Sequence, residues 1–207
     1  MDEQPKARVR EGYDRIATAY LAARPVTGAD VALLADVRRA LPPRAPVLDA
    51  GCGAGVPVTR NLAATGFRLT ALDFSPVQLD LARSLGVEAS FVQGDLAALP
   101  FADHSFAAVV SYYAVIHVPR AEHAAVFGEV YRVLRTRGLA LLCLGAGDLP
   151  EDHDPESWLG VPMYWSHFDA DTNLRLLGAA GFGIEWSRQV LDPMAHGAHL
   201  FVLARRS

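Results

Sequence analysis

The sequence predicts an α/β protein in which parallel strands alternate with helices in a doubly wound sheet. Short apolar runs of strand length alternate with segments typical of helices along the 207 residues. One such run opens the segment VLDAGCGAG (residues 47–55) and leads into a turn with three glycines at alternate positions. Acidic residues then follow the next two apolar runs, at the strand ends where such sheets bind ligands.

The predicted elements begin with a helix that contains YDRIATAY. A second helix is expected to open at Thr27, which would form a capping box with Asp30, and to end at Pro42-Pro43. Four strands, a helix and a long apolar strand follow, near 45–50, 68–73, 89–93, 106–111, 120–134 and 139–145. The last of these is an uninterrupted apolar run, which suits burial on both faces. A capped helix ending at Gly181, a sixth strand and the seventh strand AHLFVLARR complete the series.

The glycine-rich turn is predicted to bind a nucleotide. Glycine is needed where the backbone takes a positive φ or approaches a ligand closely, and the following helix points free N–H groups at that place. Asp73 follows the second strand, where a carboxylate can accept hydrogen bonds from both ribose hydroxyls. Asp95 follows the third strand and could accept a hydrogen bond from the exocyclic amine of adenine. These acids distinguish the segment from an ordinary strand-to-helix turn.

The glycine spacing separates two classes of ligand. The dinucleotide fingerprint is G-x-G-x-x-G, but Val56 occupies the position of its third glycine, and the chain has G-x-G-x-G. Together with Asp49, this pattern resembles motif I of the class I S-adenosylmethionine-dependent methyltransferases, and the resemblance covers nearly the whole chain. It implies a Rossmann-like sheet of seven strands with helices on both faces and the last strand inserted antiparallel. It also implies S-adenosyl-L-methionine as the cofactor and S-adenosyl-L-homocysteine as the product.

The resemblance further implies a set of cofactor contacts. The methionine part would lie against Gly51, Gly53 and Gly55, with Asp49 near its amino group. The ribose would bind Asp73. The other implied contacts are Phe74, Gly94, Asp95 and Leu96 around the adenine, Ser111 after the fourth strand, and Tyr13 and Tyr20 on an N-terminal lid helix. For Tyr13, a packing role on an amphipathic helix stays equally open.

Length and composition are consistent with one methyltransferase domain over residues 1–207. Its expected parts are a helical lid (1–44), a cofactor-binding core (45–145), a substrate-covering insertion (146–170) and a C-terminal helix with strands (171–207). The longest apolar stretch is too short to cross a bilayer and the N-terminus lacks a secretory signal, so a soluble cytoplasmic protein is expected, as a monomer or homodimer. Cys52 and Cys143 form no disulfide framework or metal-ligand pattern, so no metal is expected.

The acceptor of the methyl group is predicted to be a small molecule, with no nucleic acid or membrane as partner. The net charge is −4 and the arginines are scattered, whereas a general nucleic-acid binder would concentrate positive charge on one face. Methyltransferases acting on amines of DNA bases or on protein glutamine carry an Asp/Asn-Pro-Pro-aromatic motif after the fourth strand. This chain has Ser111-Tyr112-Tyr113-Ala114 at that place.

The least generic segment is 147–168, a long connection placed to cover the acceptor. The aromatic residues expected to line the acceptor pocket are Trp158, Tyr164 and Trp165 of this segment, together with Tyr112 and Tyr113. The segment also carries acids that could attract a cationic amine, although a solvated acidic turn is the more ordinary interpretation: Asp148, Glu151, Asp152, Asp154 and Glu156.

His117 is the first candidate for a general base, because histidine titrates near neutral pH and the loop after the fourth strand should face the acceptor. His167 is the second candidate. Either histidine could instead satisfy a loop carbonyl or cap a helix. His196 and His199 occur in HGAH, where the glycine and a predicted strand argue against a shared helical face and a metal site. Two alternatives stay open: a non-catalytic module that binds S-adenosylmethionine, and an NAD-dependent oxidoreductase, which Val56 and Asp95 disfavour.

Overall fold

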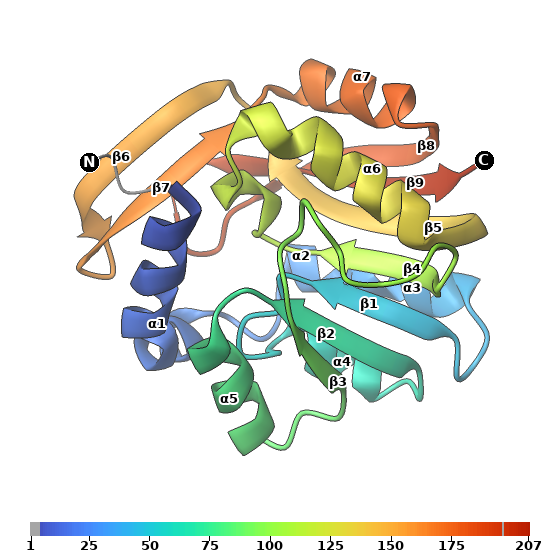
Figure 1. Ribbon diagram of the computed structural model, residues 1–207, viewed down its shortest axis with the longest axis horizontal. Helices are drawn as coiled ribbons and strands as arrows, with labels where there is room; N and C mark the ends of the chain where they lie inside the picture. Colours follow the sequence, from blue (N-terminus) through green and yellow to red (C-terminus); the bar gives the residue numbers. More distant parts are fainter. Residues whose placement is uncertain (1–4, 196) are drawn as a thin grey trace.

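The seven-stranded sheet predicted from the sequence is confirmed. The computed structural model describes residues 5–195 and 197–207, and only the main chain of 151–157. The strands are ordered β3-β2-β1-β4-β5-β9-β8 (Figure 1). Their bounds are β1 (Pro46–Ala50), β2 (Arg68–Asp73), β3 (Ser90–Gln93), β4 (Phe106–Ser111), β5 (Leu134–Gly145), β8 (Phe182–Leu191) and β9 (Ala198–Arg206). Strand β9 is antiparallel to both β5 and β8, and the other neighbouring strands pair in parallel.

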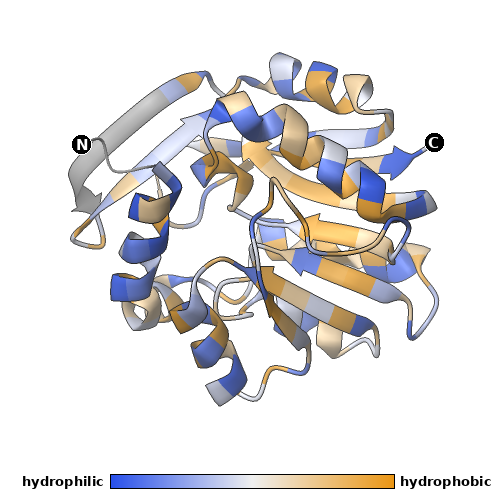
Figure 2. Ribbon diagram, viewed as in Figure 1, coloured by the Kyte–Doolittle hydropathy of each residue, from blue (hydrophilic) through white to orange (hydrophobic). Residues whose placement is uncertain are grey.

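Helices cover both faces of this sheet (Figure 1). On one face lie α6 (His123–Val133) and α7 (Ala170–Ala179), which bury Phe127, Val130 and Leu177 against the strands. On the other lie α2 (Ala29–Ala32), α3 (Leu34–Ala40) and α4 (Val58–Ala63), with α5 (Pro76–Ser84) packed on β2. The central strands are apolar along most of their length, while the helices turn polar residues outward (Figure 2). The core is therefore two apolar layers, one on each side of the sheet.

Two helices begin at a capping side chain, and the capping box predicted for a third helix does not form. Ser75 caps α5 by accepting a hydrogen bond from the Gln78 N–H at 3.0 Å, and Asp169 caps α7 by accepting one from the Thr172 N–H at 2.8 Å. The capping box predicted at Thr27 is wrong, because the N-cap of α2 is Gly28. The carboxylate of Asp30 is buried and binds Arg24 at 2.5 Å instead of capping the helix.

The segment after β5 folds into a hairpin rather than a long irregular connection. Strands β6 (Leu149–Trp158) and β7 (Val161–His167) pair antiparallel as a separate two-stranded sheet. Its two-residue turn is Leu159-Gly160, where both residues have positive φ values of 52° and 81°, as the tight hairpin turns require. Leucine is rare in this conformation, and the sequence therefore gives no usual hairpin signal here.

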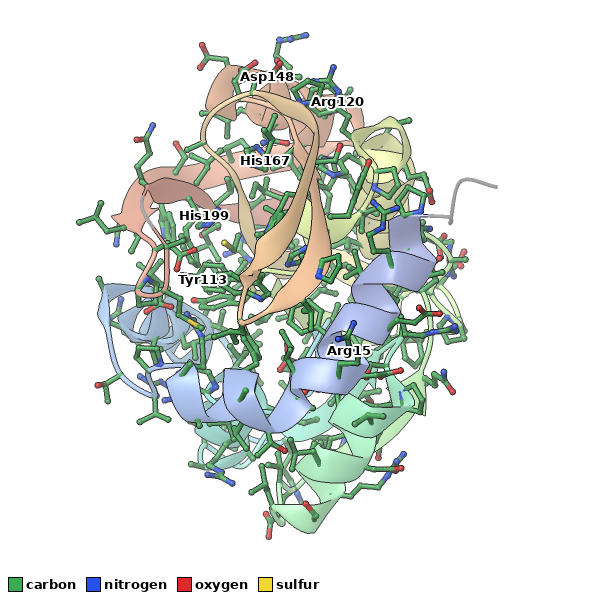
Figure 3. The ribbon with its side chains drawn as sticks, turned by 90° about the vertical axis from the view of Figure 1, so that its left-hand side faces the viewer. Arg15, Tyr113, Arg120, Asp148, His167 and His199 are labelled. Carbon is green, nitrogen blue, oxygen red and sulfur yellow. The ribbon has the colours of Figure 1, made fainter. Side chains whose placement is uncertain are left out.

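The hairpin and α1 (Pro5–Ala23) lie side by side over the carboxyl ends of the parallel strands (Figures 1 and 3). Val9 and Ile16 of α1 pack against Val161, Met163 and Tyr164 of β7. A Cβ atom added to Gly12 would lie 3.0 Å from the Cε of Met163, so the glycine allows the close approach of helix and strand. Among the described residues, no helix has the length and apolar character needed to cross a bilayer.

Candidate active site

A cavity opens under α1 at the carboxyl ends of β1, β2 and β3, and we call it the first cavity. It holds about 1020 Å³ of space with its open mouth included. Nearly all of the predicted cofactor contacts line it: Tyr13, Tyr20, Asp49, Gly51, Gly53, Asp73, Phe74, Gly94, Asp95 and Leu96. The fold thus brings together residues spread over more than eighty positions of the chain.

The glycine turn forms one wall of the first cavity. Gly51, Gly53 and Gly55 have φ values of 82°, 53° and 73°, all in the region that favours glycine. A Cβ atom on Gly51 would lie only 2.2 Å from the Cβ of Ala114, which follows β4. Gly55 is buried outside the cavity, and a Cβ there would meet Val87 at 3.1 Å. Gly55 therefore shapes the turn, whereas Gly51 and Gly53 line the first cavity.

Asp73 stands at the end of β2 with its carboxylate held by main-chain donors. Its two oxygens accept hydrogen bonds from the N–H of Gly53 at 2.8 Å and the N–H of Ser75 at 2.9 Å. Each oxygen keeps a further lone pair for a ligand in the cavity. Burial raises the pKa of Asp73 to about 6, although these main-chain hydrogen bonds oppose the rise. The carboxylate is therefore ionised at neutral pH and oriented before any ligand binds.

Asp49 at the end of β1 is buried more deeply. Its Oδ2 accepts a hydrogen bond from the Thr59 hydroxyl at 2.5 Å. Burial raises the pKa of Asp49 to about 7, and the nearby Asp73 charge adds to the rise. A cationic amino group placed beside Asp49 would favour its ionised form, which is the role the sequence predicts.

The far end of the first cavity is closed by ionic contacts that the sequence did not indicate. Lys6 of α1 donates to Asp95 at 2.7 Å and also pairs with Glu122, which follows β4. The other oxygen of Asp95 accepts a hydrogen bond from the Ala97 N–H at 2.9 Å. Lys6 lies 89 residues from Asp95 in the chain, so no local motif could have linked them.

Gln78 is a second residue that the sequence missed in this cavity. Its side chain is buried in the first turns of α5, and its Nε2 donates to the Tyr13 carbonyl at 3.3 Å. Its Oε1 finds no hydrogen-bond partner among the described residues. That oxygen lies 3.7 Å from where a Cβ of Gly53 would stand. A buried acceptor without a partner is costly unless a ligand supplies a donor.

Ser111 does not join the predicted contacts. Its side chain is buried outside both cavities described here, and its hydroxyl donates to the Ala50 carbonyl at 2.7 Å. This bond ties the end of β4 to the end of β1. Ser111 thus supports the loop beyond it, and Tyr112, Tyr113 and Ala114 form the cavity wall instead.

A second cavity adjoins the first one beneath the hairpin, and it holds about 1090 Å³ with its open side included. Its walls come from α1, the segment after β4, the hairpin and the β8–β9 loop. Five residues line both cavities, and we call them the seam: Tyr13, Tyr20, Arg24, Tyr113 and His117. A molecule in the second cavity therefore reaches one in the first cavity across the seam.

Aromatic rings enclose part of the second cavity in a closed series of contacts. Tyr13 stacks edge-on against Tyr20 at 5.3 Å and against His117 at 5.3 Å. Trp158 lies 6.3 Å from Tyr20 and 5.8 Å from Trp165, and Trp165 lies 5.7 Å from His117. These centroid distances are those of interacting aromatic pairs. The lid helix, the hairpin and the segment after β4 thus build one aromatic wall.

The predicted acceptor contacts divide into three groups. Tyr113, Trp158 and Trp165 line the second cavity. Tyr112 lines only the first cavity, and its hydroxyl donates to the Asp30 carbonyl at 2.9 Å. Tyr164 is buried outside both cavities, within the apolar contact between α1 and β7.

Of the acids predicted to attract a cationic amine, Asp148 is the one whose side chain the structure describes, and it lies outside both cavities. Asp148 pairs with Arg120 at 2.9 Å near the outer edge of the molecule (Figure 3). The side chains of Glu151, Asp152, Asp154 and Glu156 lie outside the described residues, so the prediction for them stays as it was.

His117 occupies the seam with both ring nitrogens engaged. Its Nδ1 lies 2.8 Å from the Tyr164 carbonyl, and its Nε2 lies 2.9 Å from the Tyr13 hydroxyl. The carbonyl can only accept, so Nδ1 carries the proton and Nε2 accepts from the tyrosine. Burial lowers the pKa of His117 to about 4. The imidazole is therefore neutral at working pH, but it is a weak base whose free lone pair is already used.

His167 lies at the end of β7, away from both described cavities. Its Nδ1 bonds the Gly147 carbonyl at 2.8 Å, and its ring packs on Gly145, where a Cβ atom would meet it at 2.1 Å. This is the carbonyl-satisfying role that the sequence left open. His196 lies outside the described residues, and the described ones contain no group of three His, Cys, Asp or Glu side chains placed to hold a metal ion.

Arg24 of the seam forms a buried ion pair with Asp30. Arg24 donates to Asp30 at 2.5 Å, with side-chain exposures of 4% and 3%. The guanidinium lies 4.3 Å above the ring of Tyr113, whose hydroxyl donates to the same carboxylate at 3.1 Å. Tyr113 itself has a positive φ of 54°. Strain of this kind persists only where surrounding contacts fix the residue, and here Asp30 and Arg24 fix it.

The comparisons with known proteins now bear on this geometry. Residues 47–138 match the family model described as "Methyltransferase domain". This part of the chain is similar to methyltransferase domains. The matched residues contain the glycine turn, Asp73 and Asp95, so the recognition of a class I S-adenosylmethionine-dependent methyltransferase from these motifs is confirmed.

Individual relatives cover different parts of the molecule. The sterol 24-C-methyltransferase erg-4 of Neurospora crassa is 38% identical over 98 residues, which are 44% of this chain and 25% of that protein. The chain thus spans about a quarter of the length of the curated relatives it matches. A Burkholderia thailandensis 1,6-didemethyltoxoflavin-N1-methyltransferase, solved with its substrate and S-adenosylhomocysteine, aligns with a TM-score of 0.69 at 23% identity over 96% of this chain and 84% of its own.

The fold is also shared by a protein named for another reaction. The [4+2]-cyclase SpnF aligns with a TM-score of 0.72 at 19% identity, over 95% of this chain and 94% of its own. At such identities the likeness concerns the fold, and the activity has to be argued from the site.

The bond between Tyr13 and His117 leads to a prediction about stability. His117→Phe and Tyr13→Phe should each lower the free energy of unfolding by about 1–3 kcal/mol, because each leaves a buried polar partner without its bond. The double variant should lose less than the sum of the two, since both changes break the same contact. Urea unfolding of all four proteins measures the coupling. Strictly additive losses would mean that the 2.9 Å contact contributes nothing.

Proposed function

We propose that the protein transfers a methyl group from S-adenosylmethionine in the first cavity to a small molecule in the second cavity. The observation that carries this proposal is the shared wall. The glycine turn, Asp73 and Asp95 surround one cavity, an aromatic wall surrounds the other, and five residues line both.

The first cavity suits S-adenosylmethionine in shape and in chemistry. Gly53 lacks a Cβ atom beside the Gln78 Oε1, an acceptor in need of a donor, and Gly51 lets the glycine turn approach Ala114 closely. Asp73 would bind the ribose hydroxyls, Asp49 would face the amino group, and Asp95 would lie at the adenine edge. Gln78 would accept one further hydrogen bond from the nucleoside.

When bound, the cofactor supplies a methyl group activated by a sulfonium. The protein's own contribution is to align the acceptor and exclude water. Helix α1 and the hairpin cover the strand ends, and Lys6 fastens the first turns of α1 to Asp95 and Glu122. The aromatic wall would hold a flat acceptor against the seam.

A second candidate function is a module that binds S-adenosylmethionine without transferring its methyl group. The same fold occurs in a protein named a cyclase, so the fold by itself does not require methyl transfer. Methyl transfer is preferred because the second cavity is roomy and meets the first cavity directly.

Calorimetric titration of the protein with S-adenosylmethionine, S-adenosylhomocysteine and NAD, after removal of carried-over ligand, tests the cofactor. Micromolar binding of the first two and none of NAD is expected. Binding of NAD alone would overturn the proposal. A protein that binds the cofactor and turns over no small acceptor would support the non-catalytic alternative.

Asp73→Ala is expected to weaken S-adenosylhomocysteine binding by about 1–3 kcal/mol, the cost of leaving buried polar partners unpaired. In the wild type the affinity should fall as the pH drops through about 6, because the pKa of Asp73 is raised to that value and the ribose hydroxyls need an ionised acceptor. Calorimetry at several pH values measures both effects. Asp80→Ala, at an exposed position on α5, is the matched control and should bind as the wild type does.

We also propose that the chain acts as one domain divided at the predicted positions, in the cytoplasm, as a monomer or a homodimer. The helical lid and the hairpin support the division, since each covers the same edge of the sheet. Light scattering of the purified protein distinguishes the two oligomeric states.

A further inference from the structure

We propose that the second cavity binds a flat aromatic molecule with an acidic hydroxyl group, and that His199, oriented by Asp192, accepts the proton of that hydroxyl. The inference rests on the proposed function and adds to it the class of acceptor and the proton acceptor. Neither Asp192 nor His199 belongs to a motif of the cofactor half, and both line the second cavity alone.

The pair stands at the base of the β8–β9 hairpin. The register pairs Leu191 with Ala198 and Val190 with His199, so the two side chains flank the loop that joins the strands. Because β9 is antiparallel, its first residues lie at the same edge of the sheet as the carboxyl ends of the parallel strands. His199 also pairs with Gly145 at the end of β5. The topology therefore brings this residue to the ligand-binding edge.

The contact with Asp192 determines which ring nitrogen of His199 carries a proton. The Asp192 Oδ2 lies 2.8 Å from the His199 Nε2, and its Oδ1 accepts a hydrogen bond from the Met194 N–H at 2.7 Å. The hydrogen bond from His199 lowers the pKa of Asp192, although burial opposes it. An ionised carboxylate can only accept, so Nε2 carries the proton and Nδ1 holds a lone pair. That Nδ1 is buried and has no hydrogen-bond partner among the described residues.

The position of His199 relative to the seam suits a proton acceptor. Its ring stands 5.2 Å from the ring of Tyr113 at 90°, and Tyr113 lines both cavities. Figure 3 shows these two residues close to one another beside the hairpin, with His167 nearer the hairpin base. His199 thus lies one ring beyond the place where the cavities meet. An acceptor molecule lying between the seam and His199 would have its nucleophilic atom close to both the first cavity and the His199 ring.

The chemistry of the walls selects the class of acceptor. The aromatic wall favours a flat, apolar body. An amine is nucleophilic in its neutral form, whereas a phenol needs to lose its proton to attack at a useful rate, so a histidine poised to accept a proton points to a hydroxyl. In that step the O–H bond breaks, its electron pair stays on the oxygen, and the proton bonds to Nδ1. The imidazolium that results faces the Asp192 carboxylate, which stabilises it.

Other charged groups lie near Asp192 and His199. Arg24 favours the ionised form of Asp192, and the positive charge of His199 would disfavour protonation of His117 and His167. The titratable and charged groups near the pair come from several packed elements. They are Tyr13 and Tyr20 on α1, Arg24 after it, Asp30 on α2, Tyr113 and His117 after β4, Cys143 on β5, and His167 on β7.

The experiment uses 4-nitrophenol as the probe, because its phenolate absorbs visible light and reports ionisation without turnover. The protein, saturated with S-adenosylhomocysteine, is mixed with the probe and titrated with base. In the wild type the bound probe should ionise at least one pH unit below the free probe, which is a tenfold shift in its acid constant. His199→Gln should abolish this shift, and Asp192→Asn should reduce it.

The matched control is His104→Gln, an exposed histidine before β4 at the opposite edge of the sheet, which should retain the full shift. Circular dichroism shows whether each variant is folded, and if His199→Gln is not, Asp192→Asn carries the test. A bound probe that ionises as in free solution, or a probe that does not bind, overturns this inference while S-adenosylhomocysteine still binds. Failure of S-adenosylhomocysteine to bind overturns the proposed function first.

Discussion

Replacing Asp30 with alanine is expected to lower the free energy of unfolding by about 3–5 kcal/mol, the usual effect of removing one partner of a buried ion pair. Arg24 and Asp30 have side-chain exposures of 4% and 3% and lie 2.5 Å apart. Without the carboxylate, the Arg24 guanidinium would remain buried without its hydrogen-bonded partner. The Tyr113 hydroxyl would also lose its acceptor. Urea unfolding followed by circular dichroism measures the loss.

The matched control is Asp36→Ala on α3. Asp36 pairs with Arg39, whose side chain is 74% exposed, so its loss should cost only about 0–1 kcal/mol. The double variant Arg24→Met, Asp30→Leu should recover much of the loss, because apolar replacement of both partners removes the unpaired charge. An Asp30→Ala variant no less stable than Asp36→Ala would contradict the account of this pair.

The sheet could be predicted because each strand carries its own signal. Apolar runs of five or six residues give β1, β2 and β4 at nearly the predicted bounds, and Ser75-Pro76 marks the start of α5. Strand β5 begins five residues earlier than predicted, at Leu134, because Leu134 pairs with Phe106 and an irregularity at residues 135–138 follows before Leu139 pairs with Ala108. Local sequence patterns determine where a strand or helix forms, but an irregularity in strand pairing depends on the neighbouring strand.

The hairpin could not be predicted from the sequence, because its turn uses Leu159, a residue with little preference for a positive φ, in place of asparagine or glycine. The capping box at Thr27 failed for a related reason. A local hydrogen bond competes with tertiary contacts, and the buried Arg24 guanidinium stabilises the Asp30 carboxylate more than a helix N-terminus would.

The candidate site likewise contains residues that could be predicted from the sequence and residues that could not. The glycines, Asp73 and Asp95 could be predicted because a nucleotide requires such residues at the strand ends, and Asp49 because the resemblance to the methyltransferase family implies it. Gln78, Lys6 and the pair of Asp192 and His199 could not, because their roles arise from contacts between elements far apart in the chain. His117 was found at the seam, but its weak basicity follows from burial, which the sequence does not show.

Gly51→Ala is expected to lower the free energy of unfolding by about 2–6 kcal/mol, combining backbone strain with overpacking. Gly51 has a φ of 82°, which an alanine adopts only under strain. In addition, the new Cβ would lie 2.2 Å from the Cβ of Ala114, so the glycine turn and the segment after β4 would have to separate. Both segments line the first cavity. S-adenosylhomocysteine binding should therefore fall below detection by calorimetry.

Gly66→Ala separates the two causes. Gly66 has a nearly equal φ of 79°, but a Cβ there would meet nothing within 4 Å. The free energy of unfolding of this variant should fall only by the backbone strain, about 1–3 kcal/mol. The variant should keep the wild-type affinity for S-adenosylhomocysteine. The difference between the variants then measures what the close approach of Gly51 to Ala114 contributes. Equal losses and equal binding in both would mean that the turn tolerates a side chain, and that the contact between the two segments does not shape the first cavity.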